Sequence, residues 1–274
     1  MEKLVITCAL DGAEVTKEQN PHLPVTPVEL AEDAARVRNA GGSMVHVHGR
    51  LPDGTPTQSG AVYAEIIKEI QARTDIIVQC STGGAVGMSA EERLQPVMLR
   101  PEMATLSAGT VNFGRGVFMN DPEMMEHFAR VMKAQGVTVE IEAFDVGHIA
   151  NALALVKQGI LTLPLHFDFV MGVPGGIPGT VKNLLLMSES IPEGCTWSVA
   201  GVGRAQLPLA TAAIILGGHV RVGLEDNIYY SKGVLASNEM LVARVVRLAR
   251  ELGREVATPD EARRILRFPE RNSR

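Results

Sequence analysis

The chain of 274 residues is predicted to be an α/β protein of the (β/α)8-barrel (TIM barrel) class. Short runs rich in Val, Ile, Leu and Thr, typical of strands, alternate along its whole length with amphipathic stretches of helical period. Eight such units follow one another without a linker or a change in composition, which favours one barrel domain over residues 1–274 with a C-terminal helical extension. A doubly wound open sheet is the alternative, but residues 8–15 lack the glycine-rich turn of its nucleotide-binding form.

The predicted strands are short and bounded by turn residues. They cover residues 3–10, 43–48, 75–81, 103–109, 137–144, 163–170, 196–201 and 219–225. Two intervening stretches, 27–41 and 121–136, have clear helical period.

Capping signals mark several helix ends. Thr26-Pro27-Val28-Glu29 combines an N-cap, a proline at the first helical position and the glutamate of a capping box, and Thr258-Pro259-Asp260-Glu261 repeats the pattern before a final helix. Gly41, Gly136 and Gly253 stand where helix C-caps are expected.

Composition excludes several partners. A net charge of -5 argues against a nucleic-acid-binding surface, and the four arginines at helical spacing are interpreted as a solvated helix face or a subunit contact: Arg244, Arg247, Arg250 and Arg254. No apolar run is long enough for a membrane span, and the first ten residues do not form a signal peptide. Three distant cysteines form no disulfide framework, so a cytoplasmic location is expected.

Two histidines end the second predicted strand. Successive strand residues point to opposite faces, so His46 and His48 share a face with Cα atoms about 7 Å apart. Two imidazoles at that separation can converge on one zinc ion at about 2.0–2.1 Å each. The alternative is a pair of buried histidines that only satisfy hydrogen bonds.

A catalytic zinc site needs a third protein ligand, and Glu225 at the end of the eighth strand is the best candidate. Strand eight neighbours strand one in a closed barrel, so the two strand ends can face each other. His148, His166 and His219 each stand alone in their segments and are interpreted as structural.

Arg221 is predicted to point into the barrel on the same face as Glu225. A buried guanidinium must be paired, and Asp226 can reach back to it. The pair is either an acid–base dyad beside the metal or a structural ion pair. Glycine-rich turns at 81–87, 172–179 and 201–204 could bring backbone amides close to an anion.

The chain resembles the β-keto acid cleavage enzymes over nearly its whole length. The resemblance is carried by seven blocks in order: residues 11–27, 46–50, 81–87, 101–114, 169–179, 197–204 and 217–233. One departure is Ser107, where an asparagine is familiar.

The resemblance implies a (β/α)8 barrel, a homotetramer, and zinc held by His46, His48 and Glu225. It implies that a β-keto acid and acetyl-CoA give acetoacetate and a new acyl-CoA, with Asp226 as base, oriented by Arg221. Ser81, Gly84 and Thr105 are expected at the substrate. Glu14 matches the acid that receives the ammonium group of 3-keto-5-aminohexanoate, which would place the reaction in lysine fermentation; dehydrocarnitine is the main rival substrate.

Two other classes of function remain open. Zinc hydrolases of the amidohydrolase type also use a His-x-His pair, but on their first strand. A non-catalytic metal-binding or scaffold protein would not need the inward Arg221.

Overall fold

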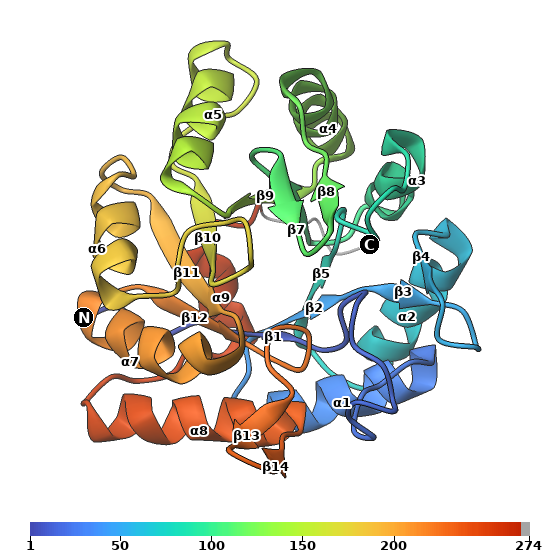
Figure 1. Cartoon of the computed structure of the whole chain (residues 1–274), viewed down its shortest axis with the longest axis vertical. Coiled ribbons are helices and arrows are strands. Elements are labelled where there is room, and N and C mark those ends of the chain that lie inside the picture. Colours follow the sequence, from blue (N-terminus) through green and yellow to red (C-terminus); the bar gives the residue numbers. More distant parts are fainter. Residues whose placement is uncertain (270–274) are drawn as a thin grey trace.

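Eight parallel strands close into a barrel in the computed structural model, which describes residues 1–269 (Figure 1). In ring order they are β1 (Ile6–Ala9), β2 (Met44–Val47), β5 (Ile77–Cys80), β6 (Met103–Ser107), β9 (Thr138–Ala143), β10 (His166–Met171), β11 (Thr196–Gly201) and β12 (His219–Val222). The pairing of β12 with β1 closes the ring. The prediction of a (β/α)8 barrel is thereby confirmed, and the open sheet is excluded.

Helices surround the barrel and cover the outer face of its strands (Figure 1). They are α1 (Pro27–Ala40), α2 (Gly60–Gln71), α3 (Ala90–Leu94), α4 (Pro122–Gln135), α5 (Val146–Lys157), α6 (Val181–Glu189), α7 (Gln206–Leu216) and α8 (Asn238–Glu251), with two 3-10 turns at η1 (Gln95–Leu99) and η2 (Gly203–Ala205). Buried aliphatic and aromatic side chains fill the space between strands and helices, as the helical and strand periodicities require.

The predicted caps are present except at Gly253: the C-cap of α8 is Leu252, and Gly253 follows it with a φ of +74°. Thr26 and Thr258 both form capping boxes with the glutamate three residues later, and Gly41 and Gly136 end α1 and α4 in the left-handed conformation. A third capping box, Ser89 with Glu92 at the start of α3, was not predicted.

The N-terminal end of the barrel is closed by α9 (Pro259–Ile265). Apolar residues at the strand starts, including Val5, Met44 and Ile77, pack against Ala262 and Leu266 of this segment. Only the C-terminal end of the barrel is therefore left to open into a site, which is where barrel enzymes carry their chemistry.

Two details of the sequence-based prediction are wrong. The eighth strand ends at Val222 rather than at residue 225, because the chain turns sharply at Gly223. Arg254 does not share a solvated helix face with Arg244: it follows α8, is buried, and donates to the carbonyl oxygens of Ile214 and Gly218.

Three short hairpins were also not predicted: β3 (Gly49–Arg50) with β4 (Pro56–Thr57), β7 (Val111–Phe113) with β8 (Gly116–Phe118), and β13 (Tyr229–Ser231) with β14 (Val234–Leu235). Each lies in a connection that follows a barrel strand, and β7–β8 stands over the barrel mouth in Figure 1. None of the helices in residues 1–269 combines the length and apolar character that a membrane crossing needs.

Candidate active site

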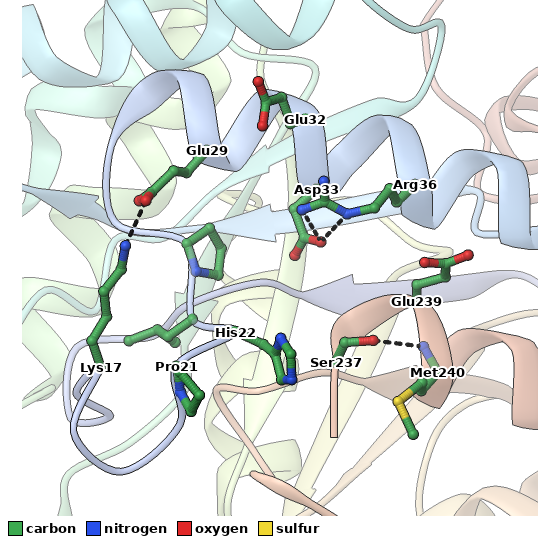
Figure 2. A pocket seen from close by; sticks show the side chains of 12 residues that line it. Lys17, Pro21, His22, Glu29, Glu32, Asp33, Arg36, Ser237, Glu239 and Met240 are labelled. Atoms are coloured by element: carbon green, nitrogen blue, oxygen red, sulfur yellow. Dashed lines mark hydrogen bonds and ion pairs between the residues drawn. The ribbon is translucent and has the colours of Figure 1, made fainter. Parts of the chain in front are cut away.

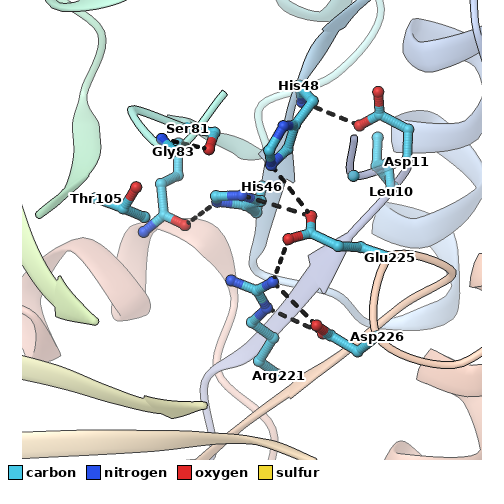
Figure 3. A network of polar contacts seen from close by, with 12 residues as sticks. Leu10, Asp11, His46, His48, Ser81, Gly83, Thr105, Arg221, Glu225 and Asp226 are labelled. Carbon is cyan, nitrogen blue, oxygen red and sulfur yellow. Dashed lines mark hydrogen bonds and ion pairs between the residues drawn. The ribbon is translucent and has the colours of Figure 1, made fainter. Parts of the chain in front are cut away.

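A cavity of about 580 Å³ opens at the C-terminal ends of the strands. Its polar end is lined by Glu14, His48, Arg221, Glu225 and Asp226, which come from the first, second and last strands or the loops that follow them. Figure 3 shows His48, Glu225, Arg221 and Asp226 linked in one network. Residues at opposite ends of the sequence meet here because β12 lies beside β1, and β1 beside β2.

His46, His48 and Glu225 form a compact cluster. Their ligand atoms lie within 4.8 Å of one another, and Oε2 of Glu225 is 3.5 Å from Nε2 of His46 and 3.6 Å from Nε2 of His48. In the described part of the chain this is the only group of three or more His, Cys, Asp or Glu side chains with such spacing. It includes neither His148 nor His166 nor His219.

Two glycines allow Glu225 to reach the histidines. Gly223 has a φ of +147°, and a Cβ there would come within 2.0 Å of the carbonyl oxygen of Ala9 in β1. A Cβ on Gly12, in the loop after β1, would lie 2.5 Å from Cγ of Glu225. A tight turn and the close approach of two loops therefore bring Glu225 to the site. It does not reach the site as part of a continuous strand whose side chains alternate between two faces.

The cluster fits a divalent cation. Nδ1 of His46 lies 2.7 Å from Oε1 of Gln79, and because an amide oxygen can only accept, Nδ1 carries the proton and Nε2 presents a lone pair. Burial lowers the pKa of His46 to about 4, which keeps the ring neutral. His46 Nε2 and Glu225 Oε2 are buried without a hydrogen-bond partner among residues 1–269. Two facing acceptors of this kind are stabilised by a cation between them.

Arg221 is held by four carboxylates. Its Nε donates to Oδ2 of Asp226 at 3.0 Å, and its Nη2 lies 2.7 Å from Oε1 of Glu225. Nη1 lies 3.4 Å from Glu142 and 3.5 Å from Asp168, which are buried in the barrel interior. The guanidinium is therefore fixed in position with no freedom to follow a ligand.

Burial raises the pKa values of Asp226 and Glu142, although Arg221 acts in the opposite direction on both. Glu225 differs: despite burial, Arg221 and the two imidazoles hold its pKa well below the usual range. Neighbouring carboxyls with opposite shifts are typical of sites that both bind a cation and move a proton.

The predicted substrate-binding residues divide into two groups. Glu14, Ser81 and Gly84 line the cavity, with Glu14 exposed at its rim. Thr105 is fully buried and bonds to Thr82 through both its hydroxyl and its carbonyl oxygen, so it supports the 81–87 turn from beneath. Its contact with substrate remains a prediction. Ser107 donates a hydrogen bond of 2.8 Å to Glu142.

Sequence reasoning missed the groups that hold the loops around the His-His-Glu cluster. The side chain of Asp11 accepts a hydrogen bond from the backbone nitrogen of His48, and burial raises its pKa to about 7. Arg50 is buried and donates to the carbonyl oxygens of Gly12 and Val15, so it fastens the loop that carries Glu14. Arg50 is the last residue of the sequence block 46–50, but only the tertiary structure shows to which loop its guanidinium donates.

A second hollow lies on the surface between the loop after β1, α1 and the start of α8 (Figure 2). Two ion pairs lie in it, Lys17 with Glu29 and Arg36 with Asp33, and two further carboxylates, Glu32 and Glu239, line it. This hollow lacks the converging imidazole and carboxylate groups of the barrel mouth.

A closed parallel barrel with a His-His-Glu cluster and a buried arginine–aspartate pair at its C-terminal mouth has the architecture of a (β/α)8-barrel enzyme. The model of the beta-keto acid cleavage enzyme family (BKACE) matches residues 3–268. The chain belongs to this family.

Known relatives agree with that assignment. The 3-keto-5-aminohexanoate cleavage enzyme of Fusobacterium nucleatum subsp. nucleatum is 55% identical over 269 residues, which cover 97% of this chain and 98% of that protein. The enzyme of the same name from Acetoanaerobium sticklandii is 52% identical with the same coverage. Among solved structures, ObcA with oxaloacetate aligns with a TM-score of 0.80 over 91% of this chain and 68% of that one, at 22% identity, and so supports the fold.

Proposed function

We propose that this enzyme condenses 3-keto-5-aminohexanoate with acetyl-CoA to give acetoacetate and 3-aminobutyryl-CoA. The observation that carries the proposal is the placement of Asp226, Arg221 and the His-His-Glu cluster at one end of a cavity whose rim carries Glu14. Relatives at 55% and 52% identity with that substrate in their names support the choice of substrate. The reaction would serve lysine fermentation in the cytoplasm.

His46, His48 and Glu225 would hold zinc, with a position left open for substrate. When bound, the ion would supply Lewis-acid polarisation of the substrate's carbonyl oxygens. His46 keeps its Nε2 lone pair available through its bond to Gln79, and Arg221 fixes the second oxygen of Glu225.

Asp226 is the proposed base. Its carboxylate would take the proton from the carbon between the two carbonyl groups, and the resulting carbanion would attack the thioester carbonyl of acetyl-CoA and expel the CoA thiolate. The thiolate would then attack the distal keto carbonyl. Cleavage of the carbon–carbon bond would release 3-aminobutyryl-CoA and the acetoacetate carbanion, which takes back a proton. A carboxylate whose pKa is raised by burial is a stronger base than an exposed one. Arg221 binds Asp226 through two nitrogens, at 3.0 and 3.1 Å, and therefore holds it as a positioning residue.

A panel of β-keto acids tests the proposal. We expect acetoacetate from 3-keto-5-aminohexanoate only when acetyl-CoA is present. A hydrolase of the amidohydrolase type would consume its substrate with water alone, and a scaffold or metal-binding protein would turn over nothing. Either result would overturn the proposed reaction.

Glu14 is proposed to pair with the substrate's ammonium group. A charge-assisted hydrogen bond contributes about 1.5–3 kcal/mol, and 1.4 kcal/mol is about a factor of ten. We expect Glu14→Gln to reduce kcat/KM for 3-keto-5-aminohexanoate by about 10- to 100-fold, near the lower limit because the rim position of Glu14 is exposed to solvent.

The control is the neutral hydroxyl analogue of the substrate, whose kcat/KM should change little. Dehydrocarnitine, a rival substrate with a quaternary ammonium that cannot donate N–H bonds, completes the comparison. An equal loss of kcat/KM for all three compounds would show that Glu14 does not interact with the charge of the substrate.

We also propose a homotetramer. The neighbouring helices α6 and α7 carry exposed apolar side chains, among them Leu186, Ile215 and Leu216. On its inner side, α7 also buries Leu209 and Ala213. Helices that are apolar on both sides are typical of subunit contacts. Ile215→Glu should lower the particle mass measured by sedimentation equilibrium; wild-type protein at the monomer mass of 29.4 kDa would contradict the proposal.

A further inference from the structure

The active-site cavity has two chemically different ends. One end is polar, and the other is an apolar wall. Strand β10 and the connections after β5, β6, β9, β10 and β11 contribute its residues: Val86, Phe113, Phe118, Phe144, Val170, Val173, Pro174 and Val202. The apolar area of this wall is larger than a short, charged keto acid would cover. An inference about its occupant rests on the proposed reaction, which brings a second and much longer substrate to the same cavity.

The β7–β8 hairpin forms a preorganised part of this wall. Phe118 contacts Phe113 and Phe144 edge to face, with ring centroids 6.3 and 6.2 Å apart. Behind it, the buried guanidinium of Arg93 lies 4.8 Å from the Phe118 ring and donates to the carbonyl oxygen of Met119 at 2.8 Å. Arg93 also donates to the carbonyl oxygen of Thr82 at 2.6 Å, so it joins the hairpin to the 81–87 turn. The aromatic surface is thus held in place before any ligand arrives.

Arg115 occupies the turn of the hairpin, between Gly114 and Gly116, and lines the cavity. Within residues 1–269 its exposed guanidinium makes no hydrogen bond or ion pair, whereas Arg221, the other guanidinium of the cavity, is fixed by four carboxylates. The polar end carries Glu14, Glu225 and Asp226 and repels phosphate groups. Arg115 is therefore the group of the cavity that is free to bind an anion.

We propose that the apolar wall receives the pantetheine arm of acetyl-CoA and that Arg115 binds the phosphates of its nucleotide end. The thioester then enters the cavity from the hairpin side, and the keto acid occupies the side of Glu14 and the His-His-Glu cluster. This arrangement separates the polyanionic part of the cosubstrate from the carboxylates that surround Arg221.

The test compares acetyl-CoA with S-acetyl-N-acetylcysteamine, a thioester that has the reacting group but no phosphate. Arg115→Glu should raise KM for acetyl-CoA by about tenfold or more, with kcat close to wild type, because a charge pair is replaced by a repulsion. KM for the truncated thioester should not change. Added salt should raise KM for acetyl-CoA in wild type and much less in the variant.

Arg204→Glu is the matched control. Arg204 is an exposed arginine of η2, two residues from Val202 of the wall, but it does not line the cavity. We expect its KM for acetyl-CoA to stay within about twofold of wild type, as for a surface charge that binds nothing. An unchanged KM in Arg115→Glu, an equal rise with both thioesters, or a rise only in Arg204→Glu would each overturn the placement. Wild type that makes acetoacetate from neither thioester would instead refute the proposed reaction itself.

Discussion

Asp226→Asn is expected to lower kcat by about 10²- to 10⁴-fold while leaving metal content and thermal stability close to wild type, since general-base catalysis contributes rate enhancements of about that size. The amide keeps the shape and one hydrogen-bond acceptor for Arg221, but it cannot take a proton. Steady-state kinetics with acetyl-CoA and the keto acid, together with metal analysis and a melting curve, measure all three quantities.

Asp168→Asn provides the control for this variant. Asp168 also lies beside Arg221, at 3.5 Å, but it is fully buried and does not line the cavity. Burial and the neighbouring Glu140 raise its pKa well above the usual range, although Arg221 acts in the opposite direction. An amide at this position keeps the shape and one hydrogen-bond acceptor of the side chain, as in Asp226→Asn. A similar loss of kcat in both variants, or near wild-type kcat in Asp226→Asn, would mean that Asp226 serves structure and that another group is the base.

His46→Ala and His48→Ala are expected to abolish zinc binding or to weaken it sharply, because the two remaining groups cannot hold a catalytic ion. Activity should fall with metal content. The measurement is metal stoichiometry of the purified variants, followed by competition with a chromogenic chelator to obtain affinities.

His22→Ala is the matched control, since His22 is exposed and belongs to the separate surface hollow near α1. It should retain the zinc content of the wild type. Full zinc occupancy and wild-type activity in either cluster variant would refute the assignment of these ligands.

Structural features that depend only on residues close together in the sequence could be predicted from the sequence. Strand and helix periods, the capping boxes at Thr26 and Thr258, and the helix-ending Gly41 and Gly136 are decided within a few residues, and all are present. The shared face of His46 and His48 also follows from alternation along one strand, and their rings lie 5.2 Å apart. The number and order of these local units were enough to predict the barrel.

Glu225 shows where local rules fail. It was placed at the site by extending the eighth strand to residue 225, yet β12 ends at Val222 and the carboxylate arrives through the turn at Gly223. Nothing near residue 225 in the sequence shows that Ala9 and Gly12 leave room for this approach. The hairpin that carries Arg115 was missed as well, although the pattern VNFGRGVF at 111–118, with Gly-Arg-Gly between alternating apolar residues, is typical of a hairpin.

The charge network around Arg221 was decided by the tertiary structure alone. Its partners Glu142 and Asp168 precede it by 79 and 53 residues and come from other strands, β9 and β10. Closure of the barrel brings them into one interior, where burial makes an unpaired charge costly and each group's pKa depends on all of the others. The sequence determined which residues carry chemistry and on which strands they lie. Only the closed barrel decided which of them share a buried interior, where the His-His-Glu cluster lies beside the carboxylates that surround Arg221.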